Sequence, residues 1–408
     1  MSVGLPANAV EAKATATLAT CDCGTLSGED SVMNVQGTGI AASVPTTGKR
    51  ASRDLRVDLV RGVALLIIFS DHVRGNPVRE FMPISLGFSD MAEWFVFLLG
   101  YVNGIRRARP LIRPVGHLLP WRGGEGTLGR CLKLYAAILL MQVLTVIILA
   151  VAHAGGIQSV SLADLMLPRS GIEPSLWTTL TLQCLLINSC VLALYLILIW
   201  IVPLAAVLLR SRPLATVAAS VAVYISVQIW PSTLSLPSPW AEAFYFNPFA
   251  WQLPFVLGMA CGAAGPSYKG FIPRSMLALF AAACGLEVAF LIKVDLWNPP
   301  FDVGIDKVTL APLRLLHFYC VLIVGRFLLP RNFRFLQSAV LRPIVLCGQH
   351  SLVTYCTGGL LATIGTLLMA KYGSNPGWTI AIHMAGWTGC LLVAGLFAGK
   401  EKKELAVT

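Results

Sequence analysis

Long apolar segments constrain the fold of this chain more than any other feature of its sequence. Each is about twenty residues long, the length that an α-helix needs to cross the hydrocarbon core of a bilayer, whereas a transmembrane strand needs about ten residues of alternating polarity. Because backbone polar groups must find partners inside a bilayer, the segments predict an all-α fold. Ten segments can be marked, with the approximate bounds 57–75, 89–106, 128–152, 177–207, 213–230, 248–265, 275–293, 307–328, 343–369 and 377–398.

The composition agrees with a polytopic membrane protein of about ten transmembrane helices. Of the 408 residues, 56% are hydrophobic and only 12% are charged, and the mean hydropathy is +0.72. These values are too apolar for a soluble protein with one or two cores. The fourth segment is long enough to tilt or break, and Pro203 near its end suits a helix stop or a kink.

Positive charge gathers before the first segment, at every second connection and at the carboxyl terminus. Cytoplasmic loops of membrane proteins carry such an excess, so the pattern predicts that both termini are cytoplasmic. Because the net charge of +11 sits where these loops are expected, it needs no nucleic-acid partner. The cations of the cytoplasmic side include Lys49, Arg50, Arg106, Arg107, Arg210, Arg212, Lys269, Arg274, Arg334, Arg342, Lys400 and Lys402.

Three regions are expected along the chain. Residues 1–50 are rich in Ala, Thr, Ser and Gly and lack the pattern of a cleaved signal peptide, so they predict a disordered cytoplasmic tail. Residues 51–398 form the transmembrane domain, and residues 399–408 form a short basic cytoplasmic tail.

The eleven cysteines indicate neither a disulfide framework nor a metal site. Nine of them fall in or beside apolar segments without metal-ligand spacing and are interpreted as small core residues. Cys21 and Cys23 form a lone C-x-C motif, which is a weak indication of metal binding. No metal is therefore expected.

The first segment contains the stretch "RGVALLIIFSDH", with Arg61 at one end and Asp71 and His72 at the other. Eleven residues of α-helix return to within about 20° of the starting direction and rise about 16 Å, so Arg61 and His72 share a face. Asp71 points about 100° away and cannot orient His72. Ionisable groups in a spanning helix usually face the protein interior or a wet cavity. An equally weighted alternative is that Arg61 reaches lipid phosphates and His72 caps a helix end.

Polar side chains recur at a similar depth in two other segments. Entering from outside, "GFSDMAEWFVFLLGY" puts Glu93 one turn below Asp90, and "DKVTLAPLRLLHFY" puts Arg314 and His317 on one face. The outer half of the membrane could thus collect a catalytic set, although internal ion pairs that hold helices together are an alternative. Its members are His72, Glu93, Arg314 and His317, with Asp306 and Lys307 at the mouth of the eighth segment.

A cationic entrance is expected on the cytoplasmic side, and it suits a phosphate-rich ligand. Ordinary positive-inside anchoring is at least as good an interpretation of two of its members, Arg130 and Lys133. The full set is Arg61, Arg130, Lys133, Gln349 and His350.

On the outer side, the sixth segment opens with "FNPFAWQL". Asn247, Trp251 and Gln252 there could meet a sugar by ring stacking and hydrogen bonds. A tryptophan at this position is more often a membrane-interface anchor.

Several ordered motifs resemble the OpgC proteins, bacterial membrane proteins that succinylate osmoregulated periplasmic glucans. They are "RDLRVDLVRGVALLIIFSDHVRGN", "GFSDMAEWFVFLLGY", "NPFAWQLPFVLGM", "DKVTLAPLRLLHF" and "CGQHSL", and they extend over most of residues 53–370. OpgC is similar in turn to a wider class of membrane acyltransferases that carry an arginine and a histidine separated by ten residues in the first helix. Lys133, in "RCLK", stands where that class often has a second arginine.

The resemblance implies an O-acyltransferase of the bacterial inner membrane. A succinyl group would pass from a cytoplasmic acyl-coenzyme A, succinyl-CoA, to hydroxyls of a periplasmic glucan. Arg61 would hold the thioester donor and His72 would take part in acyl transfer. Beyond the resemblance, Glu93 could orient the imidazole, and Arg314 could stabilise an oxyanion or bind the succinyl carboxylate.

Two other classes of function stay open at the level of sequence. Buried Arg, His and Glu side chains also describe a proton-coupled transporter or an exporter of a charged metabolite. A non-catalytic membrane subunit or sensor is the third possibility. No internal repeat is visible by eye, which favours the enzyme over the carrier.

Overall fold

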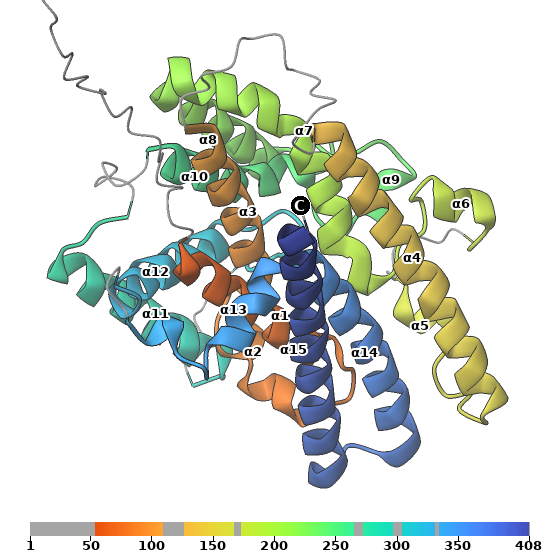
Figure 1. Cartoon of the computed structure of the whole chain (residues 1–408). Coiled ribbons are helices and arrows are strands. Elements are labelled where there is room, and N and C mark those ends of the chain that lie inside the picture. The colour runs from red at the N-terminus through yellow and green to blue at the C-terminus, as the bar shows by residue number, and fades with distance from the viewer. Residues whose placement is uncertain are drawn as a thin grey trace, which may run out of the picture. The chain divides into compact units, whose positions relative to one another are not determined.

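The structure is a computed structural model that describes residues 54–108, 126–166, 173–264, 272–296, 304–330 and 334–407. All of them belong to the unit that follows Ser52, and the predicted tail of residues 1–50 lies outside them. The described residues form helices and turns, with an isolated β-bridge between Met166 and Leu186 (Figure 1). The all-helical class is therefore confirmed.

The longer helices, in chain order, are α1 (Leu55–His72), α3 (Met91–Ala108), α4 (Thr127–Ala154), α7 (Cys190–Ser211), α8 (Pro213–Ile229), α10 (Pro248–Ala264), α11 (Met276–Lys293), α12 (Pro312–Leu328), α13 (Arg342–Gln349), α14 (Ser351–Tyr372) and α15 (Pro376–Val407). The short elements between them are η1 (Pro77–Phe81), α2 (Pro83–Leu86), α5 (Leu162–Leu165), α6 (Leu176–Leu180), η2 (Ile187–Ser189), α9 (Trp240–Ala243) and η4 (Arg334–Gln337).

Local sequence fixes several helix starts. Asp54 accepts a hydrogen bond from the backbone N–H of Arg56 and caps α1, and Ser275 caps α11 in the same way through Ala278. Helices α8 and α12 begin with proline, whose missing N–H would have no partner in the first turn. Most of the predicted segments coincide with a single helix to within a few residues.

The fourth predicted segment (177–207), which was long enough to tilt or break, is broken into α6, η2 and α7. Residues between α6 and η2 leave the helix, where the carbonyl of Leu180 accepts from the Tyr135 hydroxyl at 2.7 Å and that of Thr181 accepts from the Trp240 indole at 2.9 Å. Side chains from other elements thus replace the helical hydrogen bonds. Pro203 lies inside α7 and does not end it.

The ninth predicted segment (343–369) is wrong as a single helix, because the chain turns at His350. Gly62 of α1 faces the backbone of Ile344, and Gly348 faces that of Asp58, so α13 runs against the direction of α1. Helix α14 then runs along α1 in the same direction. The tenth segment is helical and continues beyond residue 398, because α15 extends to Val407.

The chain is a membrane protein by the length and composition of its helices. Five stretches of the described residues are long and apolar enough to cross a bilayer: Thr127–Ala154, Ile187–Ser211, Met276–Lys293, Ser351–Tyr372 and Pro376–Glu401. Helix α4 also exposes leucine, isoleucine and valine side chains that suit contact with lipid, such as Leu132, Leu140 and Ile147. The number of ten spans and the cytoplasmic location of both termini stay predictions.

Helices α3 and α10 pack most closely, through two reciprocal pairs of glycines. Gly100 and Gly104 lie against the backbone of α10, while Gly258 and Gly262 lie against the backbone of α3. A Cβ atom at any of the four would collide with a backbone carbonyl of the other helix. Both pairs have the G-x-x-x-G spacing that lets membrane helices approach.

Helix α1 lies at the centre of the described unit and contacts α3, α13, α14 and α15 (Figure 1). One face of α1 therefore meets α14 over most of its length. The candidate site develops along this contact.

Candidate active site between α1, α7 and α14

Arg61 and His72 both lie on the side of α1 that faces α14, as their spacing predicts. The Arg61 guanidinium donates through Nη2 to the hydroxyl of Ser351, the first residue of α14, at 2.9 Å. His72 lies three turns further along α1, at its last residue, beside Gly358 and Gly359 of α14. The two side chains thus mark the ends of one helix–helix contact.

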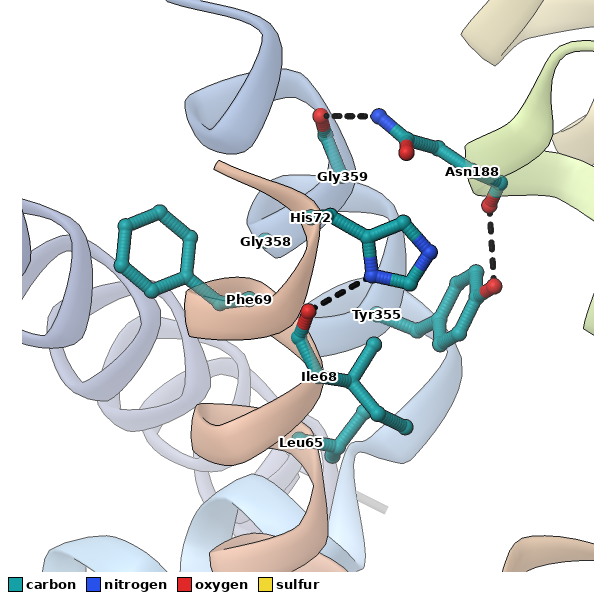
Figure 2. Close-up of a pocket in the computed structure, with 8 residues that line it drawn as sticks. All are labelled: Leu65, Ile68, Phe69, His72, Asn188, Tyr355, Gly358 and Gly359. Carbon is teal, nitrogen blue, oxygen red and sulfur yellow. Dashed lines mark hydrogen bonds between the residues drawn. The ribbon is translucent and has the colours of Figure 1, made fainter. Parts of the chain in front are cut away.

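His72 lines a small pocket at the junction of α1, α14 and η2 (Figure 2). The pocket has an empty volume of about 230 Å³, which includes space open to the outside, and its walls leave room for little more than one water molecule. Its lining residues are Leu65, Ile68, Phe69, His72, Asn188, Tyr355, Gly358 and Gly359.

A backbone contact fixes the tautomer of His72. Its Nδ1 lies 2.6 Å from the carbonyl oxygen of Ile68, one turn earlier in α1. A carbonyl can only accept, so Nδ1 carries the proton and a neutral ring keeps the lone pair on Nε2. Figure 2 shows this second nitrogen on the side of the ring where Asn188 and Tyr355 lie. The expected contact from Glu93 is not formed, because the Ile68 carbonyl occupies that role.

Asn188 and Tyr355 complete the pocket, and sequence reasoning did not single them out. The Tyr355 hydroxyl donates to the Asn188 carbonyl at 2.9 Å, and the Asn188 amide donates to the carbonyl of Gly359 at 3.0 Å. These bonds tie η2 to α14. The sequence did contain one indication of this contact, because Asn188 stands inside an apolar segment, where an amide is rare unless it is hydrogen-bonded.

Four charged residues form a separate buried cluster between α3, α12 and the loop before α12. Arg314 donates through Nε to Glu93 and through Nη2 to Asp90 at 2.8 Å, and Lys307 donates to the same Asp90 oxygen at 2.5 Å. Glu93 is fully buried and also accepts the backbone N–H of Asp90 at 2.9 Å. The two cations and two carboxylates of the cluster pair with one another, as expected for internal ion pairs that hold helices together.

His317 serves the turn before α3 and not the pocket of His72. Its Nδ1 lies 2.7 Å from the Ser89 hydroxyl and accepts the Ser89 backbone N–H at 3.2 Å, and its ring contacts Phe88. Gly87 lies so close to the imidazole that a Cβ there would collide with it. The structure thus brings Glu93 and Arg314 together, but neither they nor His317 hydrogen-bonds His72.

The residues expected to meet a sugar are enclosed by the protein. Trp251 is fully buried, and its indole donates to the carbonyls of Lys307 and Val308 at 3.0 and 3.2 Å. Asn247 donates to Leu234 at 2.7 Å. Gln252 accepts from the Ser220 hydroxyl at 2.6 Å and donates to the Ser220 carbonyl at 2.8 Å. In this conformation they hold the α8–α10 region and the loop before α12 together.

Asp306 differs from these three because its side chain is exposed. It accepts from the backbone N–H of Val308 at 3.2 Å and from the backbone N–H and hydroxyl of Thr309 at 2.8 and 2.7 Å. It therefore shapes the turn that carries Lys307 into the charged cluster.

The residues of the expected donor entrance are spread over three helix junctions. Gln349 donates to Asp58 of α1 at 3.3 Å, and His350 lies 3.9 Å from Glu401 of α15. Arg130 of α4 donates to Asn103 of α3 at 3.1 Å. Lys133 is exposed on α4. Gln349 and His350 thus lie at the end of α1 that carries Arg61.

The described part of the chain contains no group of three His, Cys, Asp or Glu side chains arranged to hold a metal ion. Its nine cysteines are free thiols, and Cys21 and Cys23 lie outside the described residues.

Comparison with known families decides the class of protein. The family model described as "OpgC protein" matches residues 53–402. The chain belongs to the OpgC family. No curated protein and no solved structure matches it. Membership of OpgC indicates an acyltransferase-type function on glucans, and the match includes every residue of the pocket and of the charged cluster.

Proposed function

We propose that this OpgC protein is an O-acyltransferase of the bacterial inner membrane that moves succinyl from a cytoplasmic coenzyme A thioester to hydroxyls of a periplasmic glucan. The family supports the transferase class and the glucan. The observation that carries the assignment is the geometry of His72, whose Nδ1–H donates to Ile68 and leaves Nε2 as a base directed into a pocket.

The reaction needs one proton acceptor and one donor, and the His72 imidazole serves as both. Nε2 takes the proton of a sugar hydroxyl while its oxygen attacks the thioester carbonyl carbon. A C–O bond forms, the C–S bond breaks, and the imidazolium returns its proton to the departing thiolate. The backbone bond to Ile68 keeps the ring in one orientation through both transfers.

The donor side is assigned to the end of α1 that carries Arg61. A guanidinium offers forked donors to phosphate oxygens, and Ser351 already holds that of Arg61 in place. We assign phosphate contacts to Arg61, Arg130, Lys133, Gln349 and His350. The pocket beside His72 holds little more than a water molecule, so we expect α14 and η2 to separate when the acyl group arrives.

In this proposal the charged cluster and the enclosed residues of α10, Trp251 and Gln252, stabilise the fold and do not contact the substrates. Glu93 and Arg314 are paired with each other, so we assign them to the packing of α3 against α12. We propose that Asp306 contacts the glucan, because its side chain is exposed near the start of α12.

The test measures thiol release and ester formation together, with purified protein, succinyl-CoA and glucan. Replacing His72 by alanine should lower the rate by about 100-fold or more, the usual contribution of a general base. The matched control is His153→Ala, because His153 is an exposed histidine at the end of α4 whose ring bonds the Val160 carbonyl. A folded His72→Ala protein that acylates glucan at the wild-type rate would refute the assignment.

A further inference from the structure

Helix α14 and the η2–α7 segment lie beside the part of α1 between Arg61 and His72. Helix α14 runs parallel to α1, because Ser351 bonds Arg61 and the Thr366 hydroxyl lies 3.5 Å from the His72 carbonyl oxygen. Asn188 lies in η2, directly before α7, and meets Gly359 and the hydroxyl of Tyr355 close to His72. Along α14, Tyr355 lies between Ser351 at the Arg61 end and Gly359 at the His72 end.

Tyr195 lies on α7, about two turns after Asn188. Its ring stacks on Phe95 of α3 with centroids 6.3 Å apart, and the same Phe95 ring lies 6.4 Å from the ring of Tyr355. Through Phe95, Tyr195 lies beside Tyr355, which stands on α14 between the contact of Arg61 and the pocket of His72.

The Tyr195 hydroxyl is buried and has no hydrogen-bond partner among the described residues. The residue as a whole is only 6% exposed. A buried hydroxyl without a partner is unfavourable, and native proteins rarely keep one unless a water, an ion or a ligand occupies the place in another state. Tyr355, the neighbouring tyrosine, has its partner in Asn188.

Two other buried groups in this region also lack partners among the described residues, namely the Ser189 hydroxyl and the Gln142 amide nitrogen. Ser189 follows Asn188 directly, and Gln142 follows Met141, whose side chain contacts Gly359. The interior near α4, η2 and α7 therefore contains buried polar groups that the described residues do not hydrogen-bond. Tyr195 is the member of this set whose ring packs on Phe95 beside the pocket residue Tyr355.

We propose that the Tyr195 hydroxyl donates a hydrogen bond to the carbonyl oxygen of the acyl thioester, between Arg61 and His72. This proposal rests on the proposed function and adds to it a residue that contacts the reacting group. As the sugar oxygen attacks, charge develops on the carbonyl oxygen, and a preplaced donor in a dry site stabilises it. Tyr195 keeps its proton throughout, because His72 carries the proton from the sugar hydroxyl to the thiolate.

The matched pair of variants is Tyr195→Phe and Tyr355→Phe, which remove the same atom from neighbouring rings. Tyr195→Phe loses no hydrogen bond in the free protein, so its melting temperature should equal or exceed that of the wild type. Tyr355→Phe loses the bond to Asn188 and should melt at a lower temperature. For acyl transfer, Tyr195→Phe should lower kcat by about 100-fold, the typical effect of losing one oxyanion donor, with a smaller change in KM for the thioester.

Binding by calorimetry separates this proposal from the proposed function. The probes are coenzyme A and a stable ketone analogue of succinyl-CoA in which a methylene replaces the sulfur. Tyr195→Phe should bind the ketone at least tenfold more weakly than the wild type and coenzyme A equally well. A Tyr195→Phe protein with wild-type kcat and wild-type ketone affinity would overturn the role of Tyr195 and leave that of His72 standing. A wild-type protein that binds neither probe would overturn both.

Discussion

Replacing Arg314 by methionine tests whether the charged cluster holds the fold or performs chemistry. Arg314 bonds both Glu93, which is fully buried, and Asp90, which is 4% exposed. Removing one partner of a buried ion pair leaves the other charge without compensation and costs about 3–5 kcal/mol of unfolding free energy. We expect a loss in this range, measured by denaturant unfolding in detergent micelles with tryptophan fluorescence.

A double-mutant cycle tests whether the loss of unfolding free energy in Arg314→Met comes from the unpaired charge of Glu93. Glu93→Leu alone should also destabilise, but the double variant should lose less than the sum of the two, by up to about 3 kcal/mol, because it leaves fewer uncompensated charges. Lys307→Met is the milder control, since the Lys307 side chain is 23% exposed and makes one bond to Asp90. It should cost about 1.5 kcal/mol, the low end for a charged hydrogen bond. An Arg314→Met protein of wild-type stability without acyl transfer would refute the structural assignment.

Three further predictions follow from particular contacts. Gly258→Val should prevent α3 and α10 from approaching, because a Cβ would collide with the Phe97 carbonyl, and size-exclusion chromatography should show little folded protein. Trp251→Phe keeps the buried ring but loses its N–H donor, so thermal melting should show a loss of about 1 kcal/mol while the KM for glucan stays unchanged. Arg61→Ala should raise the KM for succinyl-CoA more than it lowers kcat, and an unchanged KM would remove Arg61 from the donor side.

The relation between Arg61 and His72 could be predicted from the sequence because helix geometry alone determines it. A spacing of eleven residues puts both on one face of α1, and the structure shows that this face meets α14. The close packing of α3 and α10 could also have been predicted, because Gly100, Gly104, Gly258 and Gly262 form two G-x-x-x-G motifs in the printed sequence.

The length of the fourth segment indicated that it could tilt or break, but neither the position of that break nor the turn in the ninth segment could be predicted, because hydropathy does not record direction. Residues 343–369 are mostly apolar, yet the chain turns at His350 so that α13 and α14 both contact α1. Likewise, the backbone near Leu180 leaves the helix where Tyr135 supplies a partner from a distant segment. Such hydrogen bonds depend on tertiary contacts that a single sequence does not show.

The candidate site was predicted in part for the same reason. Sequence placed Glu93 and Arg314 at a matching depth, and they do meet, but their pairing excludes the expected contact of Glu93 with His72. Which nitrogen of His72 is free depends on the Ile68 carbonyl, and the unpartnered hydroxyl of Tyr195 depends on what its neighbours already bond. Both are properties of a packed interior.

Acyl transfer across a sealed membrane tests the central claim most directly. Proteoliposomes would enclose glucan and receive succinyl-CoA outside, with protein molecules whose donor side faces outward. We predict that ester accumulates on the enclosed glucan as free thiol appears outside, and that both stop in the His72→Ala protein. Ester that forms only when both substrates share one compartment, or that forms without His72, would contradict the account.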